Sequence, residues 1–404
     1  MVVATVLLTA NSIHTTKSLA LLKDSPKELL DEAWQIVNRD YVDSTFNHNN
    51  WMVVRQEYLK RSYGSRQQVY QAIQEMLGKL GDPYTNFLAP QEVKNLANDV
   101  SGDFVGVGIA VGLDERTREW IVVEPIAGTP AALAGILPED VILKINGQST
   151  SQIDTQTASK YLVGPLGSHV IITIRRRNKE LKFNLIRDRI ELHPVSYQQR
   201  KIPSGKIGYI RLPEFTSNSP KTMRRAIQDL EKQQVKGYIL DLRSNPGGLL
   251  DASVDIARMW LKQGTIVEIA NRQSEKERFT ALQNRALSNK PLVVLVDGNS
   301  ASASEILAGA LQENNRAALI GTKTFGKGLV QTLESLKDGS AVKITIAKYY
   351  TPKGRDINKV GIAPNVVVPL TEAEQAALVQ ARAVGTSADP QYAKAVTELR
   401  KLIH

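Results

Sequence analysis

The stretch that decides the fold is Pro291-Leu-Val-Val-Leu-Val-Asp-Gly-Asn-Ser-Ala-Ser302-Ala-Ser-Glu-Ile-Leu307. Its apolar start predicts a strand that is buried on both faces, because short runs of Val and Leu are typical of such strands. The small residues that follow predict a helix from about Ser302 to Asn314. Similar alternation recurs around it, with strands expected at 207–212, 237–243 and 317–321 and helices at 219–234 and 249–262. This alternation predicts a layered α/β core with a mostly parallel sheet.

Ser302 is a candidate nucleophile. At the start of a helix its hydroxyl would lie beside free backbone N–H groups and the positive end of the helix dipole. The N–H of Ala303 is then a natural donor to an oxyanion. The alternative is that Ser302 is only an N-cap and that Ser300 and Ser304 are small packing residues.

Lys327 is a candidate base. It lies 25 residues beyond Ser302, in Phe325-Gly-Lys-Gly328. A lysine must be neutral to accept a proton, and burial favours the neutral form by lowering its pKa. Gln331 is close enough in sequence to hydrogen-bond the amine only if the chain bends after Gly328, because residues i and i+4 of a strand lie about 13 Å apart. The alternative is a surface lysine in a glycine loop.

A glycine turn ends another expected strand, in Asp241-Leu-Arg-Ser-Asn-Pro-Gly-Gly248. A turn at the carboxyl end of a parallel strand can direct a backbone N–H into a cleft. The alternative is a simple connection from strand to helix.

Residues 102–190 differ from the helical pattern that precedes them. Phe104-Val-Gly-Val-Gly-Ile-Ala-Val111 alternates glycine with branched residues, and Pro130–Gly147 predicts a short helix, a strand and an Asn-Gly turn. A basic run, Arg175-Arg-Arg-Asn-Lys179, predicts the turn of a hairpin. This segment resembles a PDZ domain, although Glu139 stands where that family usually has Gly.

The resemblance assigns a carboxylate-binding loop to Gly106, Val107, Gly108 and Ile109. Successive N–H groups of such a loop can hold a carboxylate, and the bound peptide adds as a strand to the sheet edge. The alternative is that the two glycines only permit a bulge.

Composition limits the remaining classes. The 404 residues favour two or three domains, and the absence of cysteine excludes disulfides, thiolate catalysis and cysteine-ligated zinc. The net charge of +10 is compatible with an anionic membrane surface or with an ordinary basic surface. No aromatic residues accompany the basic run, so we expect no nucleic-acid partner. The apolar start, Met1–Ala10, is too short to span a bilayer and is typical of an export-signal remnant or a hydrophobic arm.

The candidate segments together resemble the carboxyl-terminal processing peptidases, the tail-specific serine peptidase family S41. The matching motifs, in the family's order, are Gly81–Thr85, Leu242–Gly248, Ser300–Ile306, Thr324–Gln331, Tyr349–Gly354 and Gly361–Asn365. The family often has Asp at the position of Asn365. The resemblance covers nearly the whole chain, and the N-terminal part is most similar to the cyanobacterial and chloroplast branch, which includes the peptidase that processes the photosystem II D1 precursor.

This resemblance implies a ClpP/crotonase-like α/β core with an inserted PDZ domain and a helical N-terminal region. It assigns Ser302 as nucleophile, Lys327 as base, Gln331 as the residue that positions the lysine, and the N–H groups of Gly248 and Ala303 as the oxyanion hole, with no cofactor and no metal. The expected parts are an arm or signal remnant (1–24), helices (25–101), the PDZ domain (102–190), the catalytic core (191–370) and a C-terminal helical segment (371–404).

The expected function is a serine endopeptidase, exported to the periplasm or thylakoid lumen, that acts on proteins with free C-termini, with the D1 precursor as an expected substrate. Membrane-surface association is compatible with the charge, and oligomer number stays open. Three alternatives are a non-catalytic PDZ adaptor, a P-loop hydrolase at Gly321–Gly328, and a Ser-His-Asp enzyme that uses His193. The P-loop lacks its final Ser or Thr, and no histidine lies in a comparable motif.

Overall fold

The computed structural model describes residues 26–114, 117–126, 128–152, 160–191, 195–381 and 383–403. The chain divides into two compact units. The first unit joins Met1–Asn95 with Glu268–Glu277 and Gly328–Tyr349, and the second holds Leu96–Val267, Arg278–Lys327 and Tyr350–His404. Two segments of the expected core, 191–370, therefore belong to the first unit.

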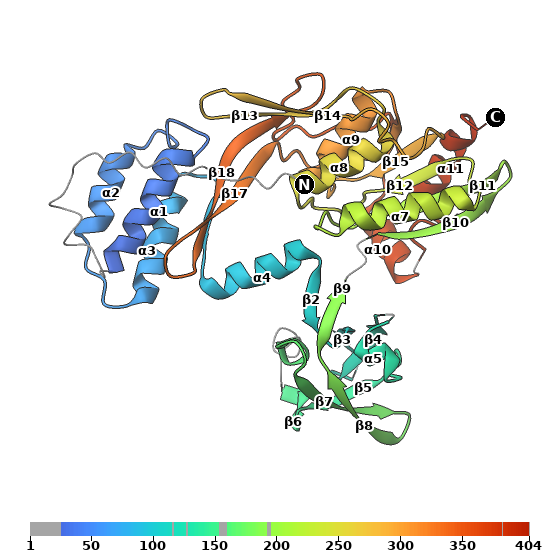
Figure 1. Ribbon diagram of the computed structural model, residues 1–404, viewed down its shortest axis with the longest axis horizontal. Helices are drawn as coiled ribbons and strands as arrows, with labels where there is room; N and C mark the ends of the chain where they lie inside the picture. The colour runs from blue at the N-terminus through green and yellow to red at the C-terminus, as the bar shows by residue number, and fades with distance from the viewer. Residues whose placement is uncertain are drawn as a thin grey trace. The chain divides into compact units, whose positions relative to one another are not determined.

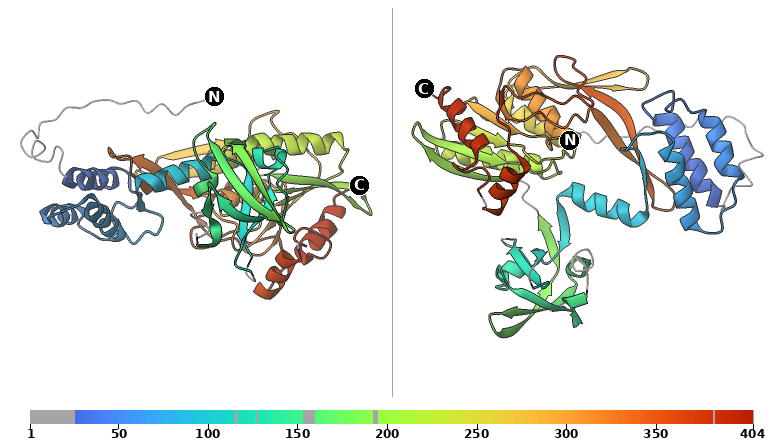
Figure 2. Two further views of the ribbon diagram at one scale, coloured as in Figure 1. Left: turned by 90° about the horizontal axis from the view of Figure 1, so that it is seen from below. Right: turned by 180° about the vertical axis from the view of Figure 1, so that it is seen from behind.

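Three helices form the N-terminal part of the first unit and lie side by side (Figures 1 and 2). They are α1 (Pro26–Asp40), α2 (Trp51–Lys60) and α3 (Arg66–Gly78). The side chains of Asn50 and Ser65 cap α2 and α3 by accepting hydrogen bonds from backbone N–H groups of the first turn. The apolar residues of 29–41 predict a buried stripe along α1, and Leu30, Trp34, Ile36 and Val37 are buried.

Strands complete the core of this unit. The sheet order is β1 (Asn86–Leu88), β18 (Ala341–Tyr350), β13 (Thr265–Asn271) and β14 (Lys276–Thr280), and β17 (Leu329–Ser335) also pairs with β18. The sequence Lys337-Asp-Gly-Ser340 predicts a hairpin turn, and the antiparallel pairing of β17 with β18 confirms it. The N-terminal region that was expected to be helical, 25–101, also contains β1, whose three residues are too few to show a strand period.

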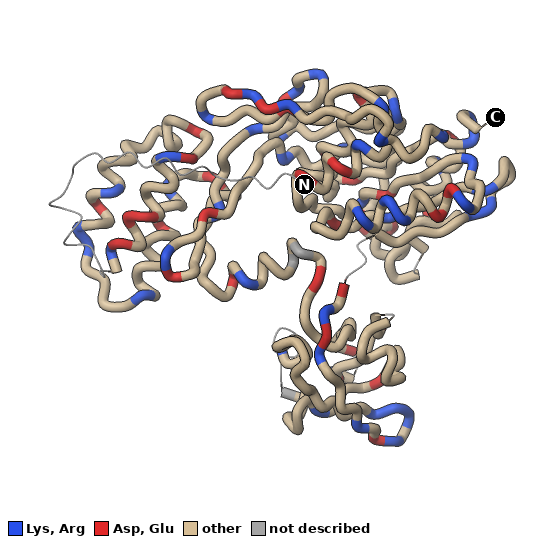
Figure 3. Tube along the Cα trace, in the orientation of Figure 1, with Lys and Arg blue, Asp and Glu red and all other residues tan. Residues whose placement is uncertain are grey.

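The PDZ segment is a small sheet with a short helix. The sheet order is β3-β4-β5-β7-β8, β6 pairs with β5, and β2 pairs with β9. The bounds are β2 (Asp103–Gly106), β3 (Ile109–Leu113), β4 (Trp120–Pro125), α5 (Pro130–Leu133), β5 (Val141–Ile145), β6 (Gln148–Ser149), η2 (Thr150–Gln152), β7 (His169–Arg176), β8 (Lys179–Ile186) and β9 (Asp188–Glu191). The predicted basic turn joins β7 to β8, and its basic residues are visible at the tip in Figure 3.

Two details of this segment concern the predictions. Glu139, where the family usually has Gly, keeps a φ of 69°, so the turn retains a left-handed conformation despite the side chain. Asn146 and Gly147 also have positive φ values, 49° and 83°, as the predicted turn requires. The sequence also predicts a helix at 154–162, most of which lies outside the described residues, and 160–162 are helical.

The large sheet of the second unit has the order β10-β11-β12-β15-β16-β19. The strands from β11 to β19 are parallel, and β10 is an antiparallel edge. Helix α11 covers one face, and α7 and α8 lie on the other (Figures 1 and 2). The bounds are β10 (Ser196–Ile202), β11 (Gly205–Arg211), α7 (Ser219–Lys232), β12 (Tyr238–Asp241), α8 (Leu250–Trp260), β15 (Leu292–Val296), α9 (Ala303–Glu313), β16 (Ala318–Gly321), β19 (Val366–Val367), α10 (Glu372–Gln380) and α11 (Pro390–Arg400).

The predicted layered α/β core is therefore confirmed. Every residue of β12 and β15 is buried, as expected for strands covered on both faces.

Helix α4 (Pro90–Ser101) precedes the PDZ segment. Among the described residues, no helix combines the length and the apolar character that crossing a membrane requires.

Candidate active site

Ser302 occupies a strained backbone position. It is the N-cap of α9 and has φ 53° and ψ −113°, a conformation that non-glycine residues seldom adopt. Such strain persists only where the surroundings enforce it, and it often marks functional residues. The sequence predicted the position of Ser302 between β15 and α9 but not its strain.

A buried carboxylate explains how this position is held. Glu305, in the first turn of α9, is fully buried, and its Oε2 atom accepts a hydrogen bond of 2.9 Å from the N–H of Ser302. The same Oε2 accepts 2.9 Å from the N–H of Lys327. Its Oε1 accepts from the Thr324 hydroxyl at 2.5 Å and from the Gly326 N–H at 2.8 Å. One side chain thus joins the loop of the candidate nucleophile to the loop of the candidate base.

Sequence reasoning did not assign Glu305 a role. A signal was present, because Glu three residues after a Ser N-cap is the pattern of a capping box. That pattern accounts for the bond to Ser302. The bonds to Thr324, Gly326 and Lys327 join residues 19 to 22 positions apart, which a local pattern does not reveal.

The Lys327 loop is fixed at further points. The Phe325 N–H donates to the Ser300 carbonyl at 3.1 Å, and the Gly326 carbonyl accepts from the Lys359 N–H at 2.7 Å. Gly326 has φ 90°, and a Cβ atom there would lie 2.8 Å from the Gly361 nitrogen. Only glycine fits so close to the backbone of Gly361. The glycines on either side of Lys327 are therefore consistent with a tightly packed loop. Lys327 itself is half-buried.

The glycine turn after β12 meets the Ser302 loop. A Cβ atom on Gly247 would lie 2.9 Å from the Ser302 Cβ and 3.1 Å from the Ala303 nitrogen. The Asn245 carbonyl accepts from the Ala301 N–H at 3.0 Å and from the Ser304 hydroxyl at 2.9 Å. The two loops therefore lie in direct backbone contact.

The N–H groups of this turn have different partners. The Asn245 side chain accepts from the Gly247 N–H at 2.9 Å. Within the described part of the chain, no hydrogen bond uses the N–H of Gly248 or that of Ala303. Gly248 has φ 129° and a Cβ there would lie 2.2 Å from the Phe215 carbonyl oxygen, so only glycine fits.

Gln331 lies in the first unit, on β17. The pairing of β17 with β18 shifts register between Val330 and Gln331, so the strand is irregular close to where the sequence required a bend. The Gln331 amide donates to the Thr345 hydroxyl at 3.3 Å. His193 lies outside the described residues.

The candidate carboxylate loop of the PDZ segment has both central carbonyls anchored. The Val107 carbonyl accepts from the Ala131 N–H at 3.0 Å, and the Gly108 carbonyl accepts from the Ile126 N–H at 2.9 Å. In a trans peptide the N–H points opposite to the carbonyl, so the N–H groups of Gly108 and Ile109 point away from these partners. This geometry resembles the backbone nests that bind anions.

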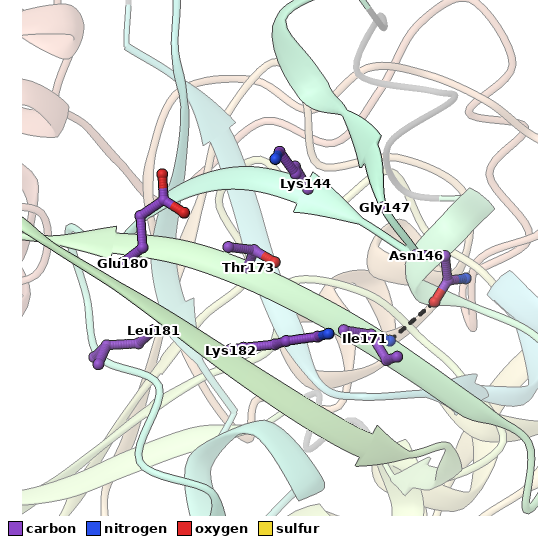
Figure 4. A pocket seen from close by; sticks show the side chains of 8 residues that line it. All are labelled: Lys144, Asn146, Gly147, Ile171, Thr173, Glu180, Leu181 and Lys182. Atoms are coloured by element: carbon purple, nitrogen blue, oxygen red, sulfur yellow. Dashed lines mark hydrogen bonds between the residues drawn. The ribbon is translucent and has the colours of Figure 1, made fainter.

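A separate open cleft of about 600 Å3 lies on the PDZ sheet (Figure 4). No residue of the carboxylate loop lines it. Its lining residues come from β5, β7, β8 and the turn after β5: Lys144, Asn146, Gly147, Ile171, Thr173, Glu180, Leu181 and Lys182.

Comparison with known proteins identifies the family of this chain. The model of peptidase family S41 matches residues 206–368, and a PDZ model matches 121–176. The carboxyl-terminal-processing protease of Synechocystis sp. (strain PCC 6803) is 43% identical over 386 residues, which cover 95% of this chain and 88% of that protein. This chain belongs to peptidase family S41.

Other relatives are also carboxyl-terminal-processing proteases or peptidases. The carboxyl-terminal-processing protease of Picosynechococcus sp. (strain PCC 7002) is 45% identical and covers 85% of this chain and 83% of its own length. The chloroplastic carboxyl-terminal-processing peptidase 2 of Arabidopsis thaliana is 37% identical, with 91% of this chain and 74% of its own length covered. A solved photosystem II D1 C-terminal processing protease is 37% identical, has a TM-score of 0.58, and covers 85% of this chain and 93% of its own.

The peptidase is thus a C-terminal processing protease with a PDZ domain, and it hydrolyses peptide bonds in protein substrates. The predicted family and multidomain fold are confirmed. The matched ranges lie inside the expected segments 191–370 and 102–190, whose bounds stay a prediction.

Proposed function

We propose that the peptidase is a serine endopeptidase in which Ser302 is the nucleophile and Lys327 the general base. The observation that carries this proposal is the position of Glu305, whose carboxylate accepts the backbone N–H groups of both residues at 2.9 Å. A buried acceptor shared by two loops fixes the distance between their backbones. Fixed distances of this kind are what proton transfer and nucleophilic attack require.

In the proposed reaction, neutral Lys327 takes the proton of the Ser302 hydroxyl as the serine oxygen attacks the scissile carbonyl. The negative oxygen that forms is stabilised by the N–H groups of Gly248 and Ala303. The C–N bond then breaks, the leaving amine takes the proton from Lys327, and an acyl-enzyme remains. Water, deprotonated by Lys327, hydrolyses this ester and regenerates the serine. We assign Gln331 to the orientation of the lysine amine.

Substrate selection is proposed to depend on the PDZ loop at Gly106–Ile109, which would bind the C-terminal carboxylate of the substrate. The anchored carbonyls of Val107 and Gly108 support this role, because they leave N–H groups directed away from the domain interior. Cleavage near the C-terminus follows from holding that end of the chain.

We further propose export to the thylakoid lumen or periplasm and the D1 precursor as a substrate. The support is the similarity to chloroplastic and cyanobacterial relatives and to a solved D1 processing protease. Association with an anionic membrane surface is compatible with the net charge of +10.

Mass spectrometry of protein C-termini tests this function. Cells that carry Ser302→Ala should accumulate proteins with extended C-termini, the D1 precursor among them, and the parent gene should restore the shorter forms. Unchanged C-termini across the proteome would contradict the function, and extended termini on other proteins alone would contradict only the D1 assignment.

A further inference from the structure

The turn at Gly81–Thr85 lies outside the groups that the proposed reaction uses, and it is held by its own carboxylate. Asp82 accepts hydrogen bonds from the Tyr84 N–H at 2.9 Å and from the Thr85 hydroxyl at 2.7 Å. A hydroxyl has one proton and a carboxylate only accepts, so the proton of the buried Thr85 is directed to Asp82. The hydroxyl oxygen of Thr85 is therefore available as an acceptor.

Thr345 of β18 donates to this acceptor. It is fully buried, its N–H lies 3.1 Å from the Thr85 hydroxyl oxygen, and the two hydroxyl oxygens are 3.4 Å apart. Its carbonyl accepts from the N–H of Val42, in the segment after α1, at 2.9 Å. Groups from the N-terminal part of the first unit thus fix the backbone of Thr345 on both sides.

Gln331 of β17 is paired directly with Thr345. The pairing of the two strands skips Ile346, which makes Ile346 the extra residue of a β-bulge. Bulges change the direction of nearby side chains and are frequent beside active sites. The Gln331 amide nitrogen donates to the Thr345 hydroxyl at 3.3 Å. The turn and Gln331 therefore belong to one chain of hydrogen bonds.

The orientation of this amide decides whether it helps or hinders a lysine base. An amine accepts a proton through its lone pair, so the lone pair must stay open while the N–H groups find an acceptor. The oxygen of a side-chain amide is such an acceptor, whereas its nitrogen would donate into the lone pair. The two ends of the amide have nearly the same shape, so hydrogen bonds must select between them. The bond to Thr345 occupies the nitrogen.

We propose that the hydrogen-bond chain from Asp82 to Thr345 holds the Gln331 amide with its oxygen toward the lysine amine. This inference rests on the proposed role of Gln331 and deepens it. The members of the chain, Asp82, Thr85 and Thr345, are positioning residues, because they act through the amide and not on the reacting atoms. The turn at Gly81–Thr85 thereby takes part in catalysis from a distance.

Thr345→Val in the full-length chain tests the proposal, because valine keeps the shape of threonine and removes the hydroxyl. In steady-state peptide cleavage, kcat should fall about tenfold, the effect of losing one hydrogen bond, with little change in KM. Thr345→Ser keeps the hydroxyl and should retain most of kcat. The matched control is Thr332→Val. Thr332 follows Gln331 on β17, so its side chain points to the opposite face, and this variant should keep both kcat and KM.

Gln331→Ala shows whether the effect of Thr345 passes through the amide. Residues that act through one shared group give non-additive effects, whereas independent effects multiply. Thr345→Val should therefore lower kcat no further when Gln331→Ala is already present. A second tenfold fall in the double variant would overturn the proposal, because Thr345 would then act by another route.

The proposal and the function on which it rests fail in different ways. Parent kcat in Gln331→Ala would overturn the proposed role of Gln331 itself. Reduced kcat in Gln331→Ala, together with parent kcat in Thr345→Val, would overturn only the hydrogen-bond chain.

Thermal unfolding shows whether Thr345→Val folds, and Asp82→Asn decides the matter if it does not. Asparagine can present an N–H where the Asp82 carboxylate accepts, which releases the Thr85 proton from its acceptor. The kcat of Asp82→Asn should fall about fivefold in the parent background and should not change in the Gln331→Ala background. Parent kcat in folded Asp82→Asn would contradict the proposal.

Discussion

The backbone N–H of Lys327 donates to the Glu305 carboxylate at 2.9 Å, and the oxygen that accepts it also accepts the N–H of Ser302. Two loops that are 25 residues apart in sequence therefore share one buried atom. The strained φ of Ser302 is maintained at this junction.

Glu305→Gln should lower kcat at least about tenfold with a small change in KM. Four donors converge on this carboxylate, and an amide offers only one acceptor oxygen while directing its own N–H groups at donors. Hydrogen bonds to a charged group contribute about 1.5–3 kcal/mol each, so the loops should shift. Steady-state cleavage of a fluorogenic peptide measures the effect.

Glu313→Gln is the control for this variant. Glu313 is a buried carboxylate at the other end of α9, about 12 Å away by helix rise, and it pairs with Arg355. Both variants should lose stability in thermal unfolding, but only Glu305→Gln should lose kcat. Equal kcat values for the two would refute the positioning role of Glu305.

Gly247→Ala should abolish most activity, with kcat reduced by about 100-fold or more. The new methyl group would lie 2.9 Å from the Ser302 Cβ and 2.8 Å from the Ala301 carbonyl, so the nucleophile loop must move. A displacement of about 1 Å at a catalytic group typically costs that much. Peptide cleavage at saturating substrate gives the measurement.

Gly354→Ala separates this steric effect from backbone strain. Gly354 also has a positive φ, 75°, but nothing lies within 4 Å of an added Cβ. This variant should lose about 1 kcal/mol of unfolding free energy from strain and keep its kcat. If Gly247→Ala were as active as Gly354→Ala, the close contact with Ser302 would be catalytically irrelevant.

Asp389→Asn should destabilise the second unit in a pH-dependent way. Asp389 is fully buried, caps α11 and pairs with Arg243 at 2.8 Å. Burial opposes its ionisation, but the hydrogen bond and charge of Arg243 outweigh this and hold the pKa of Asp389 below its usual value. Breaking such a buried pair costs about 3–5 kcal/mol.

The pH range follows from the direction of that shift. A depressed pKa contributes stability that is present above the unfolded-state value and is lost as pH falls through the folded-state value. The difference in unfolding free energy between the parent and Asp389→Asn should therefore be largest at neutral pH and shrink below about pH 4. A difference that is constant from pH 7 to pH 3, by urea unfolding, would exclude the charged pair as its source.

The sequence predicted the elements around the site better than the contacts among them. The place of Ser302 at the start of α9 and the β17–β18 hairpin follow from local periodicity and turn residues, and the structure has both. The bonds from Thr324 and Lys327 to Glu305 join separate loops, so no local pattern contains them.

The segment after Gly328 also shows that the sequence predicted backbone shape better than side-chain contacts. Strand geometry required a departure from regular extension if Gln331 was to approach Lys327, and the structure has a register shift between Val330 and Gln331. The contact made by Gln331 within its own unit is with Thr345, a residue that the sequence did not single out.

The pairing of Ser302 with Lys327 is tested most directly by labelling with a fluorophosphonate, which phosphonylates an activated serine as the serine oxygen displaces fluoride. Peptide mapping by mass spectrometry should place the adduct on Ser302 in the parent. Lys327→Ala should remove the adduct and cleavage together while leaving thermal unfolding nearly unchanged, and His193→Ala should retain both. An adduct on Ser302 that forms at the parent rate in Lys327→Ala, with full peptide cleavage, would contradict the assignment of Lys327 as the base.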